Sequence, residues 1–389
     1  MDKKEILIDL NDRIDSKNAA ETEAWIMGIL DEDPDAIPVF DASKLVYISS
    51  AGLRILMKFS KKFGEKLLIR EVSHEIYDIF DTTGFTSLFD IKKQLRNISV
   101  EGCRIIGKGA FGTVYRLDDD TIVKVYKADL KDALSIIENE KELARKGFIA
   151  GIPTAISFDV VRVGDCYGAV FELLNAKTFN DLILEEPENA DEIIKRYTYL
   201  IRSVHAIEMK PGELPTAKEK YFNRLEVIKD HISADVYSRL HSLLFDLPED
   251  LHIIHGDIQM KNVMLSENEP MLIDMDNLST GQPIFDLQAL YVCYKAFLED
   301  EPDNGLKFLG ISKEMCDRIW DGVINEYFSD RSVTERAQIV DKIRVVAYIR
   351  FLQMMVISDN KDDELTKLRI KHSIEHLNEL TGRISDLRI

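Results

Sequence analysis

The sequence predicts two folded units, a small α/β layer domain over residues 1–98 and a larger α+β domain over residues 99–389. Three observations support this prediction. The first segment alternates short apolar strands with helical patterns, which favours a layered α/β fold. The second segment opens with a glycine-rich loop and a β-hairpin and later becomes dominated by helical patterns. The full length of 389 residues also exceeds one comfortable hydrophobic core.

Short apolar runs and amphipathic periodicity define the elements of the first segment. We expect strands at residues 5–10, 37–41 and 66–70, and helices near residues 19–30, 51–63 and 73–81. The polar residues 92–97 then lead into the first strand of the second segment, and we place the boundary there.

A glycine-rich stretch, with Gly107, Gly109 and Gly112, opens the second segment. Backbone that lacks Cβ atoms can approach phosphate groups closely. A dinucleotide-binding motif of this spacing would open a helix, but here the residues that follow, 113–117 and 121–126, have the pattern of a β-hairpin. The hairpin favours a kinase-type cover over phosphates.

Lys124 lies in the second strand of this hairpin, between Val123 and Val125. Strand alternation directs it to the face opposite these valines, where a cation can meet the α- and β-phosphates of a nucleotide. An ordinary solvent-facing lysine is the alternative.

A helical pattern from about residue 131 to 146 follows, and Glu140 lies within its apolar stripe. An acid that faces inward needs a cation, so we expect Glu140 to pair with Lys124. A solvated glutamate on the helix surface is the alternative.

Three further polar residues, Asp257, Asn262 and Asp274, stand at the edges of short apolar strands. Their side-chain oxygens could surround one point, with Asn262 and Asp274 as ligands of Mg²⁺ beside the phosphates of ATP. Asp257 would then orient an attacking hydroxyl in line with the γ-phosphate. The alternative is that His255–Asp257 forms only a turn with an Asx cap.

Together these motifs make residues from about 100 to 389 resemble the protein-kinase-like fold, and within it the aminoglycoside phosphotransferase and choline kinase group. His-Gly-Asp replaces the His-Arg-Asp of typical protein kinases, and the stretch 274–286 is short and lacks Asp-Phe-Gly and Ala-Pro-Glu. It offers little platform for an extended peptide.

The resemblance implies two lobes, about 99–174 and 175–389, and a hinge where backbone groups near Glu172 and Leu174 hold adenine. It also implies that Asp286 braces the catalytic loop. For His205 we expect a packing role rather than catalysis.

In the first segment, residues 47–54 and 79–85 resemble two motifs of the STAS domain of anti-sigma-factor antagonists. In that family a serine at the start of a helix is phosphorylated by a partner kinase, and Ser50 matches its position. A phosphate at a helix start meets free backbone N–H groups and the positive end of the helix dipole. This chain carries Ser49 where those antagonists usually carry Asp, and the alternative is that Ser49 or Ser50 only caps the helix.

Composition restricts the remaining function classes. The net charge of −19 argues against nucleic-acid binding, which needs basic surfaces. The four cysteines have no metal-binding spacing, and no stretch approaches the roughly 20 apolar residues of a membrane span. We therefore expect a cytoplasmic protein without a membrane partner. Residues 1–98 carry 14 basic and 18 acidic residues, a net charge of −4, which leaves −15 for the rest and would suit a cationic substrate.

The leading hypothesis is an ATP- and Mg²⁺-dependent kinase that phosphorylates a hydroxyl of a small molecule and carries a regulatory STAS-like domain, through which a protein partner could bind. The alternative is a protein Ser/Thr kinase that acts on a STAS serine in a partner-switching pathway. A third hypothesis is an interaction module that binds nucleotide only as a ligand.

Overall fold

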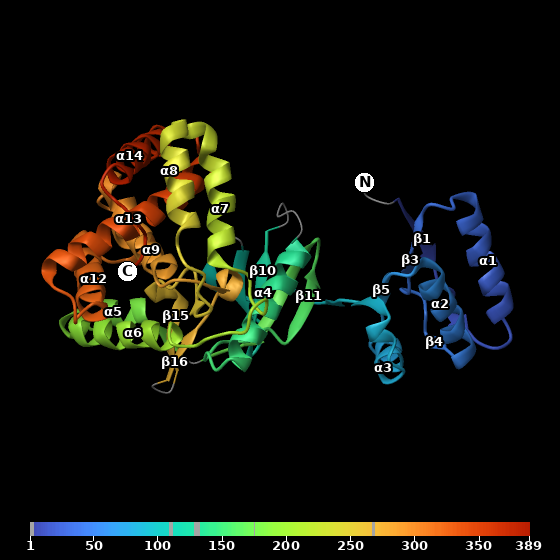
Figure 1. Cartoon of the computed structure of the whole chain (residues 1–389). Coiled ribbons are helices and arrows are strands. Elements are labelled where there is room, and N and C mark those ends of the chain that lie inside the picture. Colours follow the sequence, from blue (N-terminus) through green and yellow to red (C-terminus); the bar gives the residue numbers. More distant parts are fainter. Residues whose placement is uncertain (1–3, 109–111, 128–132, 175, 267–268) are drawn as a thin grey trace. The chain divides into compact units, whose positions relative to one another are not determined.

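The computed structural model describes residues 4–108, 112–127, 133–174, 176–266 and 269–389. The chain divides into two compact units, one formed by residues 1–99 with 161–165 and the other by residues 100–160 with 166–389 (Figure 1). Within the described residues, no helix combines the length and the apolar character that crossing a membrane would require.

The first unit is built on a four-stranded sheet in the order β1-β3-β5-β6, in which all neighbours are parallel. Parallel strands need crossover connections, and α1, α2 and α3 provide them. Figure 1 shows these helices beside the sheet. The strands are β1 (Glu5–Asp9), β2 (Arg13–Ile14), β3 (Ile37–Asp41), β4 (Tyr47–Ile48), β5 (Leu67–Val72), β6 (Phe89–Lys93) and β7 (Arg96–Asn97). The helices are α1 (Ala19–Glu32), α2 (Ser50–Phe63), α3 (His74–Thr82) and the 3-10 turn η1 (Phe85–Ser87).

The predicted α/β layer fold of this unit is confirmed, and its expected helices agree with the observed ones to within two residues at either end. The sequence patterns missed β6, where only Phe89 and two partly buried neighbours mark an edge strand. A single core fills the space between sheet and helices, with Phe40, Phe59, Phe80 and Phe85 among its members.

The second unit begins with an antiparallel sheet that carries the predicted hairpin, β9 paired to β10, with β12 on the other side of β10. Its strands are β8 (Arg104–Lys108), β9 (Gly112–Arg116), β10 (Thr121–Tyr126) and β12 (Cys166–Glu172). Strand β11 (Asp159–Val163) begins in this unit, and its residues from Val161 onward belong to the first. Helix α4 (Ala133–Ile149) contacts β12 and lies beside this sheet (Figure 1).

The rest of the second unit is mainly helical, as predicted. Its helices are α5 (Phe179–Glu185), α6 (Ala190–Val204), α7 (Ala217–Ile228), α8 (Ala234–Phe245), α9 (Ile284–Tyr291), α10 (Phe297–Asp300), α11 (Asn304–Leu309), α12 (Lys313–Tyr327), α13 (Val333–Val356) and α14 (Glu364–Thr381). The short strands are β13 (Lys177–Thr178), β14 (Ile253–Ile254), β15 (Val263–Ser266), β16 (Glu269–Leu272) and β17 (Ser279–Thr280). The 3-10 turns are η2 (Pro187–Asn189), η3 (Lys229–His231), η4 (Met260–Asn262) and η5 (Met275–Asn277), and η6 (Val292–Ala296) is a π-helical segment.

Two small sheets position the polar residues of this unit. One has the order β13-β15-β16, and the other pairs β14 with β17. Because β15 and β16 are antiparallel and Val263 faces Leu272, the residues just before β15 and just after β16 come together. Asn262 is in the first position and Asp274 is near the second, so the register brings these two predicted site residues to one edge.

Candidate active site

A cavity of about 820 Å³ opens within the second unit, in the range typical of small-molecule sites. Part of its lining is apolar and comes from both the sheet and the helical region: Val114, Ala169, Phe171, Met264 and Ile273. The polar part includes the predicted residues Lys124, Glu140, Asn262 and Asp274. An apolar slot that ends in charged groups suits a flat base joined to phosphates.

Lys124 lies in the middle of β10, opposite Ala169 on β12 and Val114 on β9. Its ammonium is 3.2 Å from both carboxylate oxygens of Glu140 and 2.6 Å from Oδ1 of Asp274. The predicted pairing of Lys124 with Glu140 is therefore present in the structure. A third, unpredicted contact comes from Asp274, 150 residues away in sequence.

The surroundings of Lys124 keep it charged. Burial alone would lower the pKa of its ammonium, but the carboxylates of Glu140 and Asp274 outweigh burial and raise the pKa above its ordinary value. Tyr126 also donates its hydroxyl to Glu140. Glu140 is therefore held from two sides on the inner face of α4, where only 6% of its surface is exposed.

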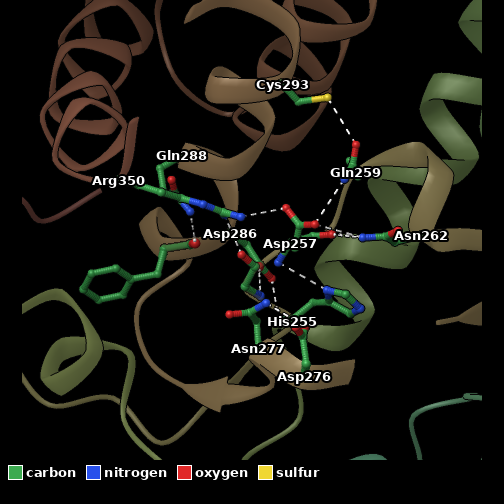
Figure 2. Close-up of polar contacts among 12 residues, drawn as sticks. His255, Asp257, Gln259, Asn262, Asp276, Asn277, Asp286, Gln288, Cys293 and Arg350 are labelled. Atoms are coloured by element: carbon green, nitrogen blue, oxygen red, sulfur yellow. Dashed lines mark hydrogen bonds and ion pairs between the residues drawn. The ribbon is translucent and has the colours of Figure 1, made fainter. Parts of the chain in front are cut away.

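Asp257 lies on the loop between β14 and η4, and several donors converge on it (Figure 2). The side-chain amide of Asn262 donates to its backbone carbonyl at 2.8 Å and to its Oδ2 at 3.1 Å. Gln259 donates to the same Oδ2 at 3.1 Å. Because these bonds use Nδ2 of Asn262, the amide oxygen of that residue is directed away from Asp257.

Arg350 on α13 holds the other side of Asp257 (Figure 2). Its Nη2 donates to Oδ1 of Asp257 at 2.9 Å, and its Nη1 donates to the carbonyl of Gly256 at 2.8 Å. Burial would lower the pKa of this guanidinium, but the Asp257 carboxylate raises it. No sequence pattern singles out Arg350, because it is 93 residues from Asp257 and lies in the second half of α13, which is buried on most sides.

Asp286 is fully buried and braces the loop that carries Asp257, as the family resemblance implied. Its two carboxylate oxygens accept from the backbone N–H groups of His255, at 2.9 Å, and Gly256. His205 contacts Asp286 at 2.9 Å and Tyr327 at 2.8 Å, so it supports the brace from the core. Gly256 has φ of 82°, and a Cβ there would lie 2.8 Å from Asn277, so the loop has no room for the arginine of protein kinases.

The two carboxylates that follow β16 have different surroundings. Asp274 adopts a left-handed backbone conformation with φ of 64°, which is uncommon outside glycine and asparagine. Asp276, two residues later, hydrogen-bonds Asn277 at 2.6 Å. Burial, together with the nearby charges of Asp274 and Glu140, raises the pKa of Asp276 to about 6.

Asn262 and Asp274 have the chemistry of a Mg²⁺ site. Ile273 donates its backbone N–H to the carbonyl of Asn262 at 3.0 Å, which holds Asn262 and the residue before Asp274 together at one edge of the β15-β16 pair. Among the described residues, no three His, Cys, Asp or Glu side chains are placed to hold a metal alone. A hard cation at Asn262 and Asp274 would therefore take its other ligands from phosphate and water, which is how Mg²⁺ is commonly bound.

The glycines expected to cover phosphates differ from one another. A Cβ on Gly112 would lie 2.2 Å from the carbonyl oxygen of Val125, so this position requires glycine for packing within the hairpin. A Cβ on Gly107 would meet only Val114, at an ordinary 3.6 Å. Both line the cavity, whereas Gly109 falls outside the described residues. Glu172 and Leu174, the expected hinge, also line it.

Ser50 is the first residue of α2 in the other unit, and it is exposed. The preceding Ser49 is the N-cap, with its hydroxyl accepting from the N–H of Ala51 at 3.2 Å. The capping role therefore belongs to Ser49, and the Ser50 side chain stands at the open helix start.

The cavity of the second unit brings together Gly107, Gly112, Lys124, Glu140, Glu172, Leu174, Asn262 and Asp274. Asp257 joins them through its hydrogen bond to Asn262. No sequence pattern pointed to four other residues of this region: Arg350, Gln259, Tyr126 and Asp276.

Comparison with known proteins places the second unit in a family. Residues 102–308, more than half of the chain, match the phosphotransferase enzyme family. Similar folds occur in a streptomycin–ATP ternary complex of the phosphotransferase APH(2")-IIa, which is 15% identical, covers 72% of this chain and 93% of its own, and has a TM-score of 0.46. They also occur in a choline/ethanolamine kinase family protein from Mesorhizobium loti. That protein is 14% identical, the match covers 72% of this chain and 87% of the other, and the TM-score is 0.46.

The first unit matches a different family. Residues 3–98 match the STAS domain. Within them, 81 residues are 31% identical to BtrV of Bordetella bronchiseptica, a protein named as an anti-sigma factor antagonist; the match covers 20% of this chain and 69% of BtrV. The chain belongs to the phosphotransferase enzyme family and carries an N-terminal STAS domain.

Proposed function

We propose that this phosphotransferase moves the γ-phosphate of ATP to a hydroxyl of a small molecule. The proposal rests on one cavity of about 820 Å³ that is lined by the pair Lys124 and Glu140 and by Asn262 and Asp274, two residues with oxygen atoms suited to a cation. The restrained carboxylate of Asp257 is hydrogen-bonded to Asn262 beside this cavity. Phosphoryl transfer is catalysed mainly by positioning and by electrostatic stabilisation, and these groups supply both.

The nucleotide would lie with its base in the apolar slot and its phosphates toward Lys124. Glu140 holds the ammonium of Lys124 at 3.2 Å, so that the positive charge stays directed into the cavity. Backbone groups at Glu172 and Leu174 would bind the base, and Gly107, Gly109 and Gly112 would cover the phosphates. Bound at Asn262 and Asp274, Mg²⁺ would neutralise charge on the β- and γ-phosphate oxygens.

Asp257 is the group we assign to the attacking hydroxyl. The hydroxyl oxygen forms a bond to the γ-phosphorus as the bond between that phosphorus and the bridging oxygen of ADP breaks, and ADP leaves with the electron pair. The proton of the hydroxyl passes to the Asp257 carboxylate. Arg350, Gln259 and Asn262 fix that carboxylate by donating to both of its oxygens, which still have lone pairs for the acceptor.

We further propose that residues 1–98 act as a regulatory domain and residues 99–389 as the catalytic domain, with lobes of about 99–174 and 175–389. The exposed Ser50 at the start of α2 supports a switch that depends on phosphate, since a helix N-terminus stabilises negative charge. A protein partner of the STAS domain would sense that charge.

The proposed roles separate nucleotide binding from transfer, and Asp257→Asn tests the separation. We expect the rate of ADP release in this variant to fall by about 10²- to 10⁴-fold, because the general base that orients the hydroxyl is lost. Its affinity for Mg-ATP should stay within about threefold of that of the parent. Asp230→Asn, at an exposed position outside the cavity, is the matched control and should behave as the parent. Full turnover in Asp257→Asn would refute the role given to Asp257.

One observation favours a second candidate, a protein kinase that phosphorylates Ser50. Ser49 already caps α2, so the Ser50 hydroxyl is exposed for transfer. Intact-mass measurement after incubation with Mg-ATP, beside Ser50→Ala, decides between the two. Addition of 80 Da to the parent but not to the variant would favour the protein kinase. Nucleotide binding without any ADP release would instead favour a binding module.

A further inference from the structure

Three cationic side chains gather beside Asp257. Lys220 and Arg224 lie one turn apart on α7, and Arg350 reaches the same place from α13, which packs against α7. Lys220 donates to the carbonyl of Asn277 at 2.9 Å, and Arg224 donates to Gln353 at 2.7 Å. Within the described part of the chain, neither Lys220 nor Arg224 forms an ion pair, whereas Arg350 is paired with Asp257.

Lys220 and Arg224 line a small cavity that is separate from the base-binding slot. Its lining includes Lys220, Tyr221, Arg224, Gly256 and Gln288. The volume is about 20 Å³, which admits about one oxygen-sized group. Gly256 precedes Asp257 directly, so a group that enters this cavity lies next to the residue assigned to the acceptor hydroxyl.

Three of the lining residues carry buried polar atoms that have no hydrogen-bond partner in the described structure: the Tyr221 hydroxyl, Nε of Arg224 and Oε1 of Gln288. Tyr221 is 4% exposed and Gln288 is 1% exposed. Leaving a buried donor unpaired costs about 1–3 kcal/mol. Two of the three atoms are donors, and with the remaining hydrogens of the Lys220 ammonium they form a donor-rich set.

The acids that face this cluster do not balance it. Asp257 is engaged by Arg350 and by two amides. Asp276 is the other nearby carboxyl, and it accepts a hydrogen bond from Asn277 at 2.6 Å. Burial lowers the pKa of Lys220 to about 8, with Arg224 and Arg350 acting in the same direction. An incoming anion would relieve this repulsion between cations.

We infer that the acceptor carries an anionic group, a carboxylate or a phosphate, whose oxygen binds at Lys220, Tyr221 and Arg224 while its hydroxyl faces Asp257. This inference rests on the proposed function and names the substrate class of that same site. It replaces the cationic substrate suggested by the net charge of the segment, because the charge beside the reacting group is positive although the surface as a whole is acidic. A hydroxy acid or a phosphate monoester with a free hydroxyl fits; a polyamine sugar does not.

Four probes that share a glycerol-like hydroxyl arrangement test the inference on the full chain: glycerate, glycerol 3-phosphate, glycerol and 3-amino-1,2-propanediol. Their binding is measured by calorimetry in the presence of Mg²⁺ and a non-hydrolysable ATP analogue, after the affinity for that analogue has been recorded. We expect glycerate or glycerol 3-phosphate to bind at least tenfold more tightly than the neutral and cationic probes.

Two variants at one position assign the binding to the cluster. Arg224→Gln should lower the affinity for the anionic probe at least tenfold. Arg224→Lys, which keeps the charge, should restore part of that affinity. Lys229 is an exposed cation beyond the end of α7, and Lys229→Gln should leave the affinity for the anionic probe unchanged. In all of them the affinity for the analogue should match that of the parent, which also shows that the variants are folded.

The possible outcomes distinguish failure of the anionic-acceptor inference from failure of the proposed phosphotransferase function. Equal or weaker binding of the anionic probes, or anion binding that survives Arg224→Gln unchanged, would overturn the inference while leaving nucleotide binding and the proposed function intact. Failure of the analogue itself to bind would overturn the proposed function, and the inference with it.

Discussion

The proposed nucleotide side and the proposed acceptor side of the active site have opposite charge arrangements. On the nucleotide side a cation, Lys124, is enclosed by the carboxylates of Glu140 and Asp274. On the acceptor side a carboxylate, Asp257, is held by Arg350, with Lys220 and Arg224 nearby. In both places a partly buried charge is stabilised by partners of opposite sign. The difference is that, among the described residues, Lys220 and Arg224 form no ion pair, so two cationic groups remain available on the acceptor side.

The largest effect should come from removing the central cation of the nucleotide side. Lys124→Met leaves Glu140 and Asp274 without their partner and removes a donor to the phosphates. We expect turnover to fall by about 10²- to 10³-fold, with a clear loss of Mg-ATP affinity. Lys146→Met, on the outer part of α4, is the control. If Lys124→Met bound Mg-ATP as tightly as the parent, Lys124 would not be a nucleotide-binding cation, and the proposed nucleotide side would lose its defining charge.

The corresponding change on the acceptor side should affect turnover alone. Arg350→Met frees Oδ1 of Asp257 and the carbonyl of Gly256, so the carboxylate loses its orientation, and we expect kcat to fall by about 10- to 10²-fold. Arg350→Lys should recover part of this loss. Affinity for Mg-ATP, measured by titration, should stay within about threefold in both variants; a purely structural role would lower affinity and kcat together.

A matched pair of glycines tests how rigidly the phosphate cover is built. Gly112→Ala forces a Cβ against the carbonyl of Val125 and should destabilise the protein by about 1–3 kcal/mol. Gly107→Ala meets no obstacle and should be neutral or slightly stabilising. Denaturant unfolding of the two variants checks this. Equal stability would mean that β9 and β10 can separate to admit the methyl group.

The smallest effect concerns Asp276, which lies between the two sides. Its pKa of about 6 in the folded protein exceeds the ordinary 3.8, so the folded state binds its proton more tightly than the unfolded state does. The resulting penalty is absent below about pH 4, grows as the pH rises toward 6 and is complete above it. Asp276→Asn should therefore gain stability over the parent by about 1–2 kcal/mol across that window.

Unfolding midpoints of parent and Asp276→Asn at pH 4.5, 5.5 and 6.5 measure this difference. A gap between them that does not change with pH would show that Asp276 has an ordinary pKa, and the electrostatic contrast between the two sides would then be weaker than described.

The residues that line one cavity with Lys124 could be predicted from the sequence because a local pattern marks each of them, while their role toward a nucleotide stays a prediction. Strand alternation placed Lys124, helical periodicity placed Glu140, and two short strands placed Asn262 and Asp274. The acceptor side could not be predicted, because Arg224 and Arg350 meet Asp257 only through the packing of α7 against α13. Helix α13 is buried on most sides, so its periodicity does not single out Arg350. For the same reason, the net charge of the segment did not indicate the local charge beside Asp257.

In the first unit, the helices and the strands β1, β3 and β5 were predictable from helical periodicity and short apolar runs. Strand β6 was not, because three of its five residues are charged, whereas the other edge strand, β1, contains the apolar run Ile6-Leu7-Ile8. Sequence also could not decide which of two adjacent serines caps α2. That depends on where the backbone leaves the helix, and the structure assigns the cap to Ser49.

The most direct test of the central claim follows the γ-phosphate itself. The full chain is incubated with Mg-ATP labelled at the γ-phosphate and with a low-molecular-weight cell fraction, beside Asp257→Asn, and the label is located by mass spectrometry. The account predicts label on a small hydroxyl compound that bears a carboxylate or phosphate, and none with the variant. Label on Ser50, or only on inorganic phosphate, would contradict it.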